Sequence, residues 1–393
     1  MPQIPAGWEE TTLGEFAIIN PTESIKKGEV AKNIPMDFLD NFTRKISKYT
    51  EKEFSWGMKF RNWDTLFARI TPCLENGKTA YVDILDDWEI AFWSTEYIVI
   101  REKKERSNSM FLYYLSVSPF FRDIAIKAMT WTSWRQRVQT DVLVNTKLHL
   151  PLLPEQQAIA AVLSSFDDKI ELLRAENQTL EQMGQELFKE QFGKWKVEDV
   201  LPEGWRVATD YIAFEKGVEV WSSNYYEKQS ANFEFLPFYR VGDIASNGAI
   251  SNIFCDKGLL KEKIFYTNDV LLSLDGTVGR VFIWWAGWYS SGIRKLVALN
   301  SEISQAFLYF WAKSEDVQKT ISLYSEWTTI QHAGKSIPYL MISADIEKIK
   351  NSSKILNVRF DKILLNLEQI QSLSATRDQL LPKLMSGEVR VEF

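Results

Sequence analysis

The segment Pro151–Phe192, PLLPEQQAIAAVLSSFDDKIELLRAENQTLEQMGQELFKEQF, decides the fold, because it reads as one long helix in the middle of the chain. Its apolar residues recur at alternating steps of four and three, the 3.5-residue average of a coiled-coil seam. The seam residues are Ile159, Leu163, Phe166, Ile170, Leu173, Leu180 and Leu187, with Asn177 and Gly184 at the two remaining positions. A single polar seam residue such as Asn177 fixes register at a cost in stability. Pro154 and Glu155 mark the start, since proline suits a first turn and the helix dipole favours an anion there.

A second copy of this pattern ends the chain. Asp168-Lys169-Ile170 reappears as Asp361-Lys362-Ile363. The second seam again steps by four and three, through Leu356, Phe360, Ile363, Leu367, Ile370, Ser374, Arg377, Leu381 and Leu384. We expect Pro382 to kink this helix or to end it early. Two seams in one chain predict that the helices pair as a coiled coil; the alternative is that each packs only on its own domain.

The remaining sequence repeats with a period of about half the chain. Leu201–Trp205 echoes Ile4–Trp8, and Trp288–Leu299 parallels Ala91–Ile100. The order is therefore globular, helix, globular, helix, which predicts an α+β protein with two similar domains and an antiparallel pair of helices. The expected boundaries are 1–152 for the first domain, 153–193 for its helix, 194–203 for a linker, 204–352 for the second domain, 353–385 for its helix and 386–393 for a tail. Two similar surfaces held apart by a helical rod suit a bipartite target.

Length, charge and cysteine content narrow the class of protein to which the chain can belong. The chain has 393 residues, which favours two domains, and a net charge of −6. That charge argues against a uniformly basic nucleic-acid binder, so DNA contact would need a local patch or a partner's help. Cys73 and Cys255 are the only cysteines and show no disulfide or zinc spacing, which is typical of a reducing compartment such as the cytoplasm. No signal peptide and no membrane-spanning run are expected.

The sequence predicts no active site of its own. Gly334-Lys335-Ser336 resembles the end of a phosphate-binding loop, but Thr329 stands where that loop needs its first glycine. Gly276–Gly279 is only G-x-x-G, and neither cysteine has a histidine nearby. We therefore expect no catalytic residue, no metal and no bound cofactor in this chain.

The motifs in their order resemble a known family. Pro151–Phe192 closely resembles the central conserved region of type I restriction–modification specificity subunits, and Phe360–Val389 resembles their C-terminal conserved region. Leu66–Val82, Ser94–Ile100 and Gly276–Val281 resemble segments of their target recognition domains. The resemblance covers nearly the whole chain. It implies two target recognition domains that read the two halves of an interrupted DNA sequence, with the coiled coil as the spacer. It also implies docking of two methyltransferase subunits, which methylate adenine with S-adenosylmethionine, and of ATP-driven restriction subunits.

The candidate DNA-binding residues are polar side chains of the expected loops. In the first domain they are Arg69, Lys78, Ser94, Arg135 and Arg137, with Trp131–Val138 read as a loop that holds no acid. In the second they are Arg280, Arg294, Lys295, Gln331, His332 and Lys335. Arginine can bind guanine or a phosphate, and glutamine can read adenine. On the central helix, Glu155, Gln156 and Gln157 are candidate exposed contacts for partner subunits. For each set, the alternative is a plain solvated surface.

Tryptophan is unusually frequent in turn-like contexts. The chain has 15 Trp and only 18 Gly. The family usually shows glycine at the positions of Trp56, Trp63, Trp88, Trp93, Trp131, Trp134, Trp221, Trp327 and also Trp284. Restoring about nine glycines would return the glycine content to the ~7% of average proteins. Our hypothesis is a systematic departure from glycine; the alternative is that some of these rings stack on bases.

Two functions from different classes follow. The first is a non-catalytic DNA-specificity subunit that reads a bipartite target and scaffolds its partners. The second is a single-chain DNA methyltransferase or nuclease with fused recognition domains, which the missing methyltransferase motifs disfavour.

Overall fold

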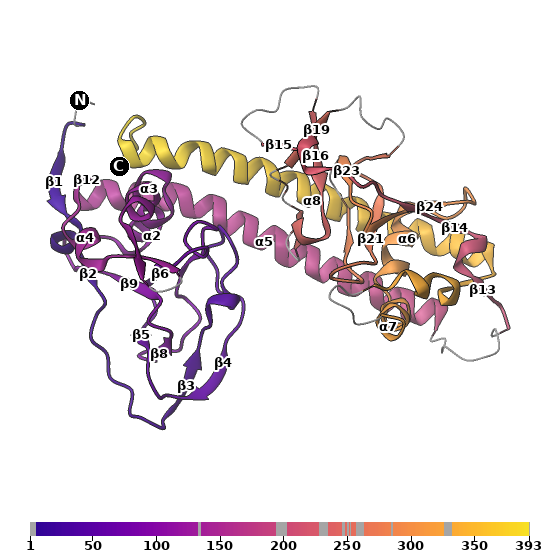
Figure 1. Ribbon diagram of the computed structural model, residues 1–393, viewed down its shortest axis with the longest axis horizontal. Helices are drawn as coiled ribbons and strands as arrows, with labels where there is room; N and C mark the ends of the chain where they lie inside the picture. Colours follow the sequence, from indigo (N-terminus) through magenta and orange to yellow (C-terminus); the bar gives the residue numbers. More distant parts are fainter. Residues whose placement is uncertain are drawn as a thin grey trace. The chain divides into compact units, whose positions relative to one another are not determined.

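The computed structural model describes residues 5–132, 135–193, 203–227, 235–245, 248–249, 251, 253–256, 263–283, 286–325 and 332–392. It divides into two compact units (Figure 1). Unit 1 comprises Met1–Ile170 with Ser372–Phe393, and unit 2 comprises Glu171–Gln371. Each unit therefore takes its long helices from both halves of the chain. The predicted Gln331, Trp134, Trp284 and Trp327 lie outside the described residues.

Unit 1 holds two four-stranded sheets. The first has the order β2-β9-β6-β7, all antiparallel, and the second has the order β4-β3-β8-β5 with β3 and β8 parallel. The strands are β2 Ala17–Ile19, β3 Val30–Asn33, β4 Thr50–Glu53, β5 Met58–Phe60, β6 Thr65–Ala68, β7 Thr79–Tyr81, β8 Ala91–Trp93 and β9 Tyr97–Glu102. Strands β6 and β7 are buried along their whole length, as sheet-core strands require. The polar interruption at Ser94–Glu96 separates two strands that belong to different sheets.

Short helices and ribbons complete unit 1. Strand β1 (Trp8–Thr12) pairs with β12 (Lys147–Pro151), and β10 (Met129–Thr132) pairs with β11 (Arg135–Val138). The helices are η1 Met36–Phe38, α1 Leu13–Phe16, α2 Ser109–Val117, α3 Pro119–Lys127 and α4 Thr140–Val144. Ser118 ends α2 and caps α3, because its hydroxyl accepts the Phe121 amide and Pro119 opens the next helix.

Unit 2 repeats the two four-stranded sheets of unit 1 in the same strand order. Its first sheet has the order β14-β24-β21-β22, and its second contains β19-β16-β23-β20 with β16 and β23 parallel and β15 added at the edge. The strands are β13 Trp205–Val207, β14 Ile212–Lys216, β15 Tyr226–Glu227, β16 Phe235–Tyr239, β17 Ile244–Ala245, β18 Gly248–Ala249, β19 Ile253–Asp256, β20 Ile264–Phe265, β21 Val270–Ser273, β22 Val281–Phe282, β23 Gly287–Tyr289, β24 Ile293–Ala298 and β25 Met341–Ser343. The helices are η2 Ala208–Asp210, η3 Ser222–Asn224, η5 Val241–Asp243, η6 Gly334–Tyr339, α6 Gln305–Ala312 and α7 Glu315–Leu323. The predicted duplication is confirmed.

The long helices pack together, as the two seams predict. Helix α5 spans Leu153–Phe192 and α8 spans Ile346–Ser386 (Figure 1). In unit 1 the start of α5 shares a core with the end of α8, through Ile159, Leu163, Leu381, Leu384 and Met385. In unit 2 the end of α5 shares a core with the start of α8, through Phe188, Phe192, Leu356, Phe360 and Ile363. The pair is therefore antiparallel, and each domain packs on both helices.

The expectation that Pro382 ends the helix early is wrong. Helix α8 begins at Ile346, before the expected 353, and continues through Pro382 to Ser386. Proline removes one backbone hydrogen bond of a helix interior. Leu381, Leu384 and Met385 flank it and are buried in the core of unit 1. Burial of these side chains outweighs the lost bond, since each contributes about 1.5–3 kcal/mol.

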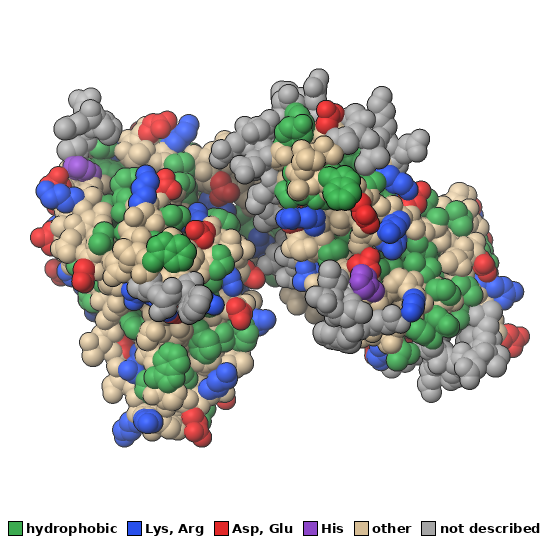
Figure 2. Space-filling view, in the orientation of Figure 1, with side chains coloured by type: hydrophobic (Ala, Val, Ile, Leu, Met, Phe, Trp, Pro, Cys, Tyr) green, Lys and Arg blue, Asp and Glu red, His purple; other side chains and the backbone are tan. Residues whose placement is uncertain are grey.

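Two of the unusual tryptophans adopt a backbone conformation that favours glycine. Trp63 has φ 74° and Trp88 has φ 66°, and both side chains are exposed. Trp56, Trp131 and Trp221 are also exposed, but Trp221 has φ −70°. Figure 2 shows hydrophobic side chains scattered among charged ones on the described surface. The glycine-like backbone expected of these positions thus holds for Trp63 and Trp88.

Candidate nucleic-acid interface

In unit 1 three of the predicted residues, Arg69, Ser94 and Arg137, lie beside the end of β6. The Arg69 amide donates to the Glu96 carbonyl at 3.0 Å, and the Val138 amide donates to the Arg69 carbonyl at 2.8 Å. The Arg69 Nη2 donates to the Val138 carbonyl at 2.9 Å. Ser94 joins this edge because its hydroxyl accepts the Glu96 amide at 3.1 Å. Arg69 is thus held by backbone groups of neighbouring segments.

Arg137 projects from the same edge and is paired with an acid. Its Nε lies 3.1 and 3.0 Å from the two carboxylate oxygens of Glu96, and its Nη2 lies 2.6 Å from Oε1. The hydrogen bond and charge of Glu96 raise the pKa of Arg137. The segment Trp131–Val138 holds no acid, as predicted, but its reading as a loop is wrong, because Arg137 lies on β11, which pairs with β10. The acid that pairs with Arg137 is Glu96, which directly precedes β9. A two-pronged pair of this kind fixes the guanidinium plane.

The other two predicted residues of unit 1 lie differently. Arg135 is exposed at the start of β11. Lys78 is half-buried, and its Nζ donates to the Met36 carbonyl at 2.9 Å. Arg135 lies two residues before Arg137 on β11 and so projects to the same side of the strand. Lys78 instead ties the segment before β7 to η1.

His332 occupies in unit 2 the place that Arg137 occupies in unit 1. The isolated bridge Ile70–Arg137 recurs as Asp275–His332. The backbone bond next to it also recurs, from the Ala333 amide to the Leu274 carbonyl at 2.7 Å. His332 Nδ1 lies 2.7 Å from Asp275 Oδ1. At this position of the repeat, unit 1 thus has an arginine and unit 2 a histidine, and each of the two is paired with a carboxylate.

The remaining predicted residues of unit 2 divide into two groups. Arg294 lies on β24, and its Nη1 donates to the Ser291 carbonyl at 2.5 Å; burial lowers its pKa, with Asp275 opposing that effect. Lys295 is the next residue on the strand, so it points to the opposite face, where it pairs with Glu215 at 3.4 Å. Arg280 donates to the Ile244 carbonyl, and Lys335 is exposed on η6. Arg294 lies close to the His332 segment, because its Nη2 is 4.0 Å from a Cβ built on Gly334. Lys335 is three residues after His332, whereas Lys295 points to the opposite face of β24.

The expectation that Glu155 and Gln156 are exposed is wrong. Glu155 is buried, accepts the Trp8 Nε1 hydrogen at 3.2 Å and pairs with Arg390 at 2.8 Å. Gln156 is buried and accepts the Asn108 amide at 2.9 Å. Both hold the first turn of α5 inside unit 1. Gln157 is the exposed member of the three.

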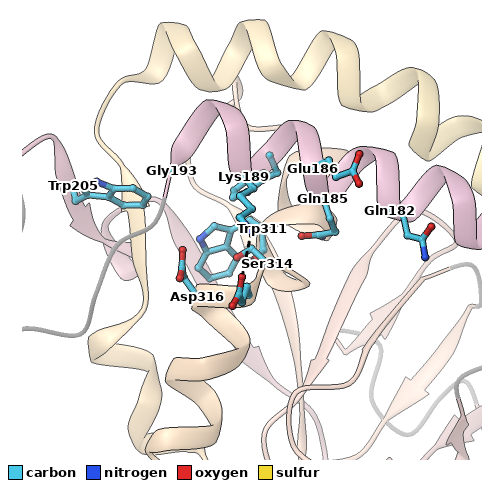
Figure 3. Close-up of a pocket in the computed structure, with 11 residues that line it drawn as sticks. Gln182, Gln185, Glu186, Lys189, Gly193, Trp205, Trp311, Ser314 and Asp316 are labelled. Atoms are coloured by element: carbon cyan, nitrogen blue, oxygen red, sulfur yellow. Dashed lines mark hydrogen bonds and ion pairs between the residues drawn. The ribbon is translucent and has the colours of Figure 1, made fainter.

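A cavity of about 300 Å³ lies beside the last turns of α5 in unit 2 (Figure 3). It is lined by Gln182, Gln185, Glu186, Phe188, Lys189, Gly193, Trp205, Trp311, Ser314, Glu315 and Asp316. Its polar lining is engaged within the protein: Gln185 donates to the Phe310 carbonyl and Trp311 to the Met341 carbonyl, each at 2.9 Å. None of the predicted DNA-binding or partner-binding residues lines it.

The acids that orient these cations were not found from the sequence. Glu96 and Asp275 lie 41 and 57 residues from their partners. Only the strand register brings them together, so no local spacing marks them. The repeat itself was the available signal: aligning the two halves places Arg137 and His332 in corresponding segments.

The chain is an internally duplicated two-domain protein. Each copy has the same β-rich fold, carries Arg137 or His332 at the same position and is followed by a long helix. The family described as type I restriction modification DNA specificity domain matches the chain twice, over residues 5–182 and 215–363. The chain belongs to this family.

Curated relatives agree with this assignment, and a solved structure shares the fold. The chain is 28% identical over 324 residues to the type I restriction enzyme MjaIX specificity subunit of Methanocaldococcus jannaschii, covering 74% of this chain and 71% of that one. It is 31% identical over 180 residues to the EcoAI specificity subunit of Escherichia coli, covering 43% and 30%. Its fold resembles the crystal structure of the type I restriction-modification system S subunit from M. genitalium, with a TM-score of 0.51, 17% identity and coverage of 98% and 97%. Within the described residues, no helix is long and apolar enough to cross a membrane.

Proposed function

We propose that the chain is the DNA sequence-specificity subunit of a type I restriction–modification system. Each β-rich domain contacts one half of a bipartite double-stranded target, and the paired helices α5 and α8 set the separation of the halves. The observation that carries this proposal is the duplication: the strand order of unit 1 recurs in unit 2, within a chain that belongs to the specificity family. Two unlike copies of one reading domain suit a target with two unlike halves.

The reading edge proposed in each domain contains Arg137 and His332. The two residues hold corresponding positions, and each is oriented by a carboxylate. Arg69 and Arg135 support the first edge, and Arg294 and Lys335 the second. Arginine at such an edge can bind guanine O6 and N7 or a phosphate oxygen. The carboxylate holds the side chain in one orientation before DNA arrives, which lowers the ordering cost of binding.

Catalysis belongs to partner subunits in this proposal. Two methyltransferase subunits dock on the helices, with exposed positions such as Gln157 in reach, and restriction subunits join the assembly. The chain acts in the cytoplasm, where its DNA targets lie. Its net charge of −6 then requires the partners to supply part of the phosphate contact.

The test is a reconstitution with a sequencing readout. Cells that carry the methyltransferase and restriction subunits are sequenced for methylated adenine with and without this chain. Methylation at a two-part motif only when the chain is present supports the proposal. Methylation of the same motif without the chain contradicts it. So does methyl transfer from radiolabelled S-adenosylmethionine by the purified chain alone, which would favour a single-chain enzyme.

A further inference from the structure

A buried polar cluster joins the two long helices in unit 1. Tyr114, on α2, donates its hydroxyl hydrogen to Asp167 on α5 at 2.6 Å. Arg377, on α8, pairs with the other oxygen of the same carboxylate. The side chains of Asp167 and Arg377 are 5% and 17% exposed. Asp167 therefore depends on Arg377 for its counter-charge, since a buried carboxylate without one is strongly destabilising.

The three corresponding positions of unit 2 carry no polar side chain. The repeated triplets Asp168-Lys169-Ile170 and Asp361-Lys362-Ile363 align Asp167 with Phe360 and Arg377 with Gly184. The triplets Phe111-Leu112-Tyr113 and Phe307-Leu308-Tyr309 align Tyr114 with Phe310. A trio of tyrosine, aspartate and arginine is thus exchanged for two phenylalanines and a glycine.

The unit 2 trio packs so closely that a side chain at residue 184 would displace the Phe310 ring. A Cβ placed on Gly184 would lie 2.1 Å from Cε1 of Phe310. Phe360 packs on the neighbouring ring of Tyr309, with centroids 5.5 Å apart. An arginine in the place of Gly184 would therefore clash with Phe310.

A second polar pair breaks the repeat in the same way. The Asn366 side-chain amide donates to Asn177 Oδ1 at 2.8 Å, and both residues are buried. The same alignment places Ile370 at the position of Asn177 and Leu173 at the position of Asn366. Asn366 also donates to Glu176 of α5 at 3.0 Å, so both acceptors of its amide lie on the other helix.

We propose that these two clusters are pairing determinants, which make α8 the partner of α5 and exclude the α5 of a second copy. In a self-paired α5, Asp167 would face Gly184 and lose its counter-charge. In a self-paired α8, Arg377 would face Phe360 and press against Phe310. The asparagines would face Leu173 or Ile370 and lose their hydrogen bond. Only the pairing of unlike helices satisfies all four positions.

This inference goes beyond the proposed function, because it rests on helix packing and not on DNA reading. Its consequence is that the two unlike domains stay together. A self-paired assembly would carry the same domain twice and would present two identical surfaces. The determinants therefore keep the protein's two halves different.

The test begins with the intact, folded chain. A protease site is inserted between residues 193 and 203, the folded chain is cleaved, and the fragments are dissociated and reassociated by a cycle of dilute denaturant. Native mass spectrometry then counts the pairs. We expect one fragment of each kind in nearly every pair. Self-pairs of either fragment in statistical proportion would overturn the proposal.

Two variants give opposite predictions. Arg377→Gly removes the clash with Phe310 but leaves Asp167 unpaired, so self-pairs of the α8 fragment should rise several-fold while those of the α5 fragment stay rare. The triple variant Tyr114→Phe, Asp167→Phe, Arg377→Gly copies the unit 2 trio into unit 1, so self-pairs of both fragments should rise. Unchanged pairing in both variants overturns the proposal.

The intact chain supplies a check that does not need separated fragments. Arg377→Gly alone should lower the denaturation midpoint more than the triple variant does, because only the single variant leaves a buried carboxylate without a cation. A triple variant less stable than the single one would contradict the equivalence of the two trios on which the proposal rests.

Discussion

Asn366 of α8 donates its side-chain amide to Asn177 of α5 at 2.8 Å, inside a seam that is otherwise mostly apolar. A polar pair in such a seam contributes less to stability than to the choice of register. Asn366 Oδ1 is buried without a hydrogen-bond partner, which underlines that the pair is not optimised for stability.

Replacing one asparagine should therefore cost more than replacing both. Asn366→Leu leaves the buried Asn177 side-chain oxygen without its donor, an expected loss of about 1–3 kcal/mol. The double variant Asn177→Leu, Asn366→Leu removes both groups and should recover most of that loss. Urea denaturation of the two variants measures the difference. Additive losses would show that the asparagines do not act as a pair.

Glycine at residues 63 and 88 should stabilise the protein. Trp63 and Trp88 have φ values of 74° and 66°, where a non-glycine residue is strained by roughly 1–3 kcal/mol. Glycine relieves the strain but loses about 0.4–1 kcal/mol through the freer unfolded chain. We expect a net gain of about 1 kcal/mol for Trp63→Gly or Trp88→Gly.

Trp221 is the matched control for these two changes. It is 82% exposed, close to the 87% of Trp88, but its φ of −70° suits any residue. Trp221→Gly should give no gain. An equal gain at all three positions would point to exposed aromatic surface rather than backbone strain as the cause.

Cys255 should resist alkylation in the folded protein. It is buried, and burial raises the pKa of its thiol to about 11. At pH 8 the reactive thiolate is therefore scarce, and the sulfur is also shielded. A Cys73→Ser variant isolates this thiol. Labelling with iodoacetamide should occur only at the rate of unfolding, and rapid labelling of the native variant would contradict the burial.

Alkaline pH should destabilise unit 1 through Tyr81. Burial raises the pKa of Tyr81 to about 12, although a hydrogen bond to Ser109 opposes the effect. An unfolded tyrosine titrates near 10. The folded state therefore binds more protons between these values, so stability is complete below about pH 10 and falls as pH rises toward 12.

The loss assigned to Tyr81 is about 3 kcal/mol across that interval. Tyr81→Phe should have a shallower decline between pH 10 and 11 than the wild type, as measured by urea midpoints. Equal slopes would assign the decline to other groups.

The sequence predicted the elements that depend on local period and missed those that depend on distant contacts. The steps of four and three from Ile159 to Leu187 located α5, because helix periodicity is written in neighbouring residues. An early end of α8 at Pro382 was expected as one alternative and is not seen, since the stabilising contacts of Leu381 and Leu384 come from the first domain, far away in sequence.

The same limit applies to the site. Glu155 looked like an exposed first-turn acid, but Trp8 and Arg390 cover it from 147 and 235 residues away. Arg137 was found as a loop cation, whereas its partner Glu96 was not, because only the sheet register joins them. The local sequence pattern was enough to select candidate residues. Their hydrogen-bond and ion-pair partners depend on tertiary contacts and could not be predicted.

The central claim, that each domain reads one half of the target, is tested most directly by binding to half-altered duplexes. The motif is taken from the methylome, and duplexes with either half scrambled are titrated against the reconstituted complex. Arg137→Ala and His332→Ala are compared with Lys147→Ala, an exposed lysine away from both edges that pairs with Glu10. The account predicts that Arg137→Ala abolishes discrimination at one half, that His332→Ala abolishes it at the other, and that Lys147→Ala changes neither. Loss of discrimination at the same half in both variants, or at neither half, would contradict it.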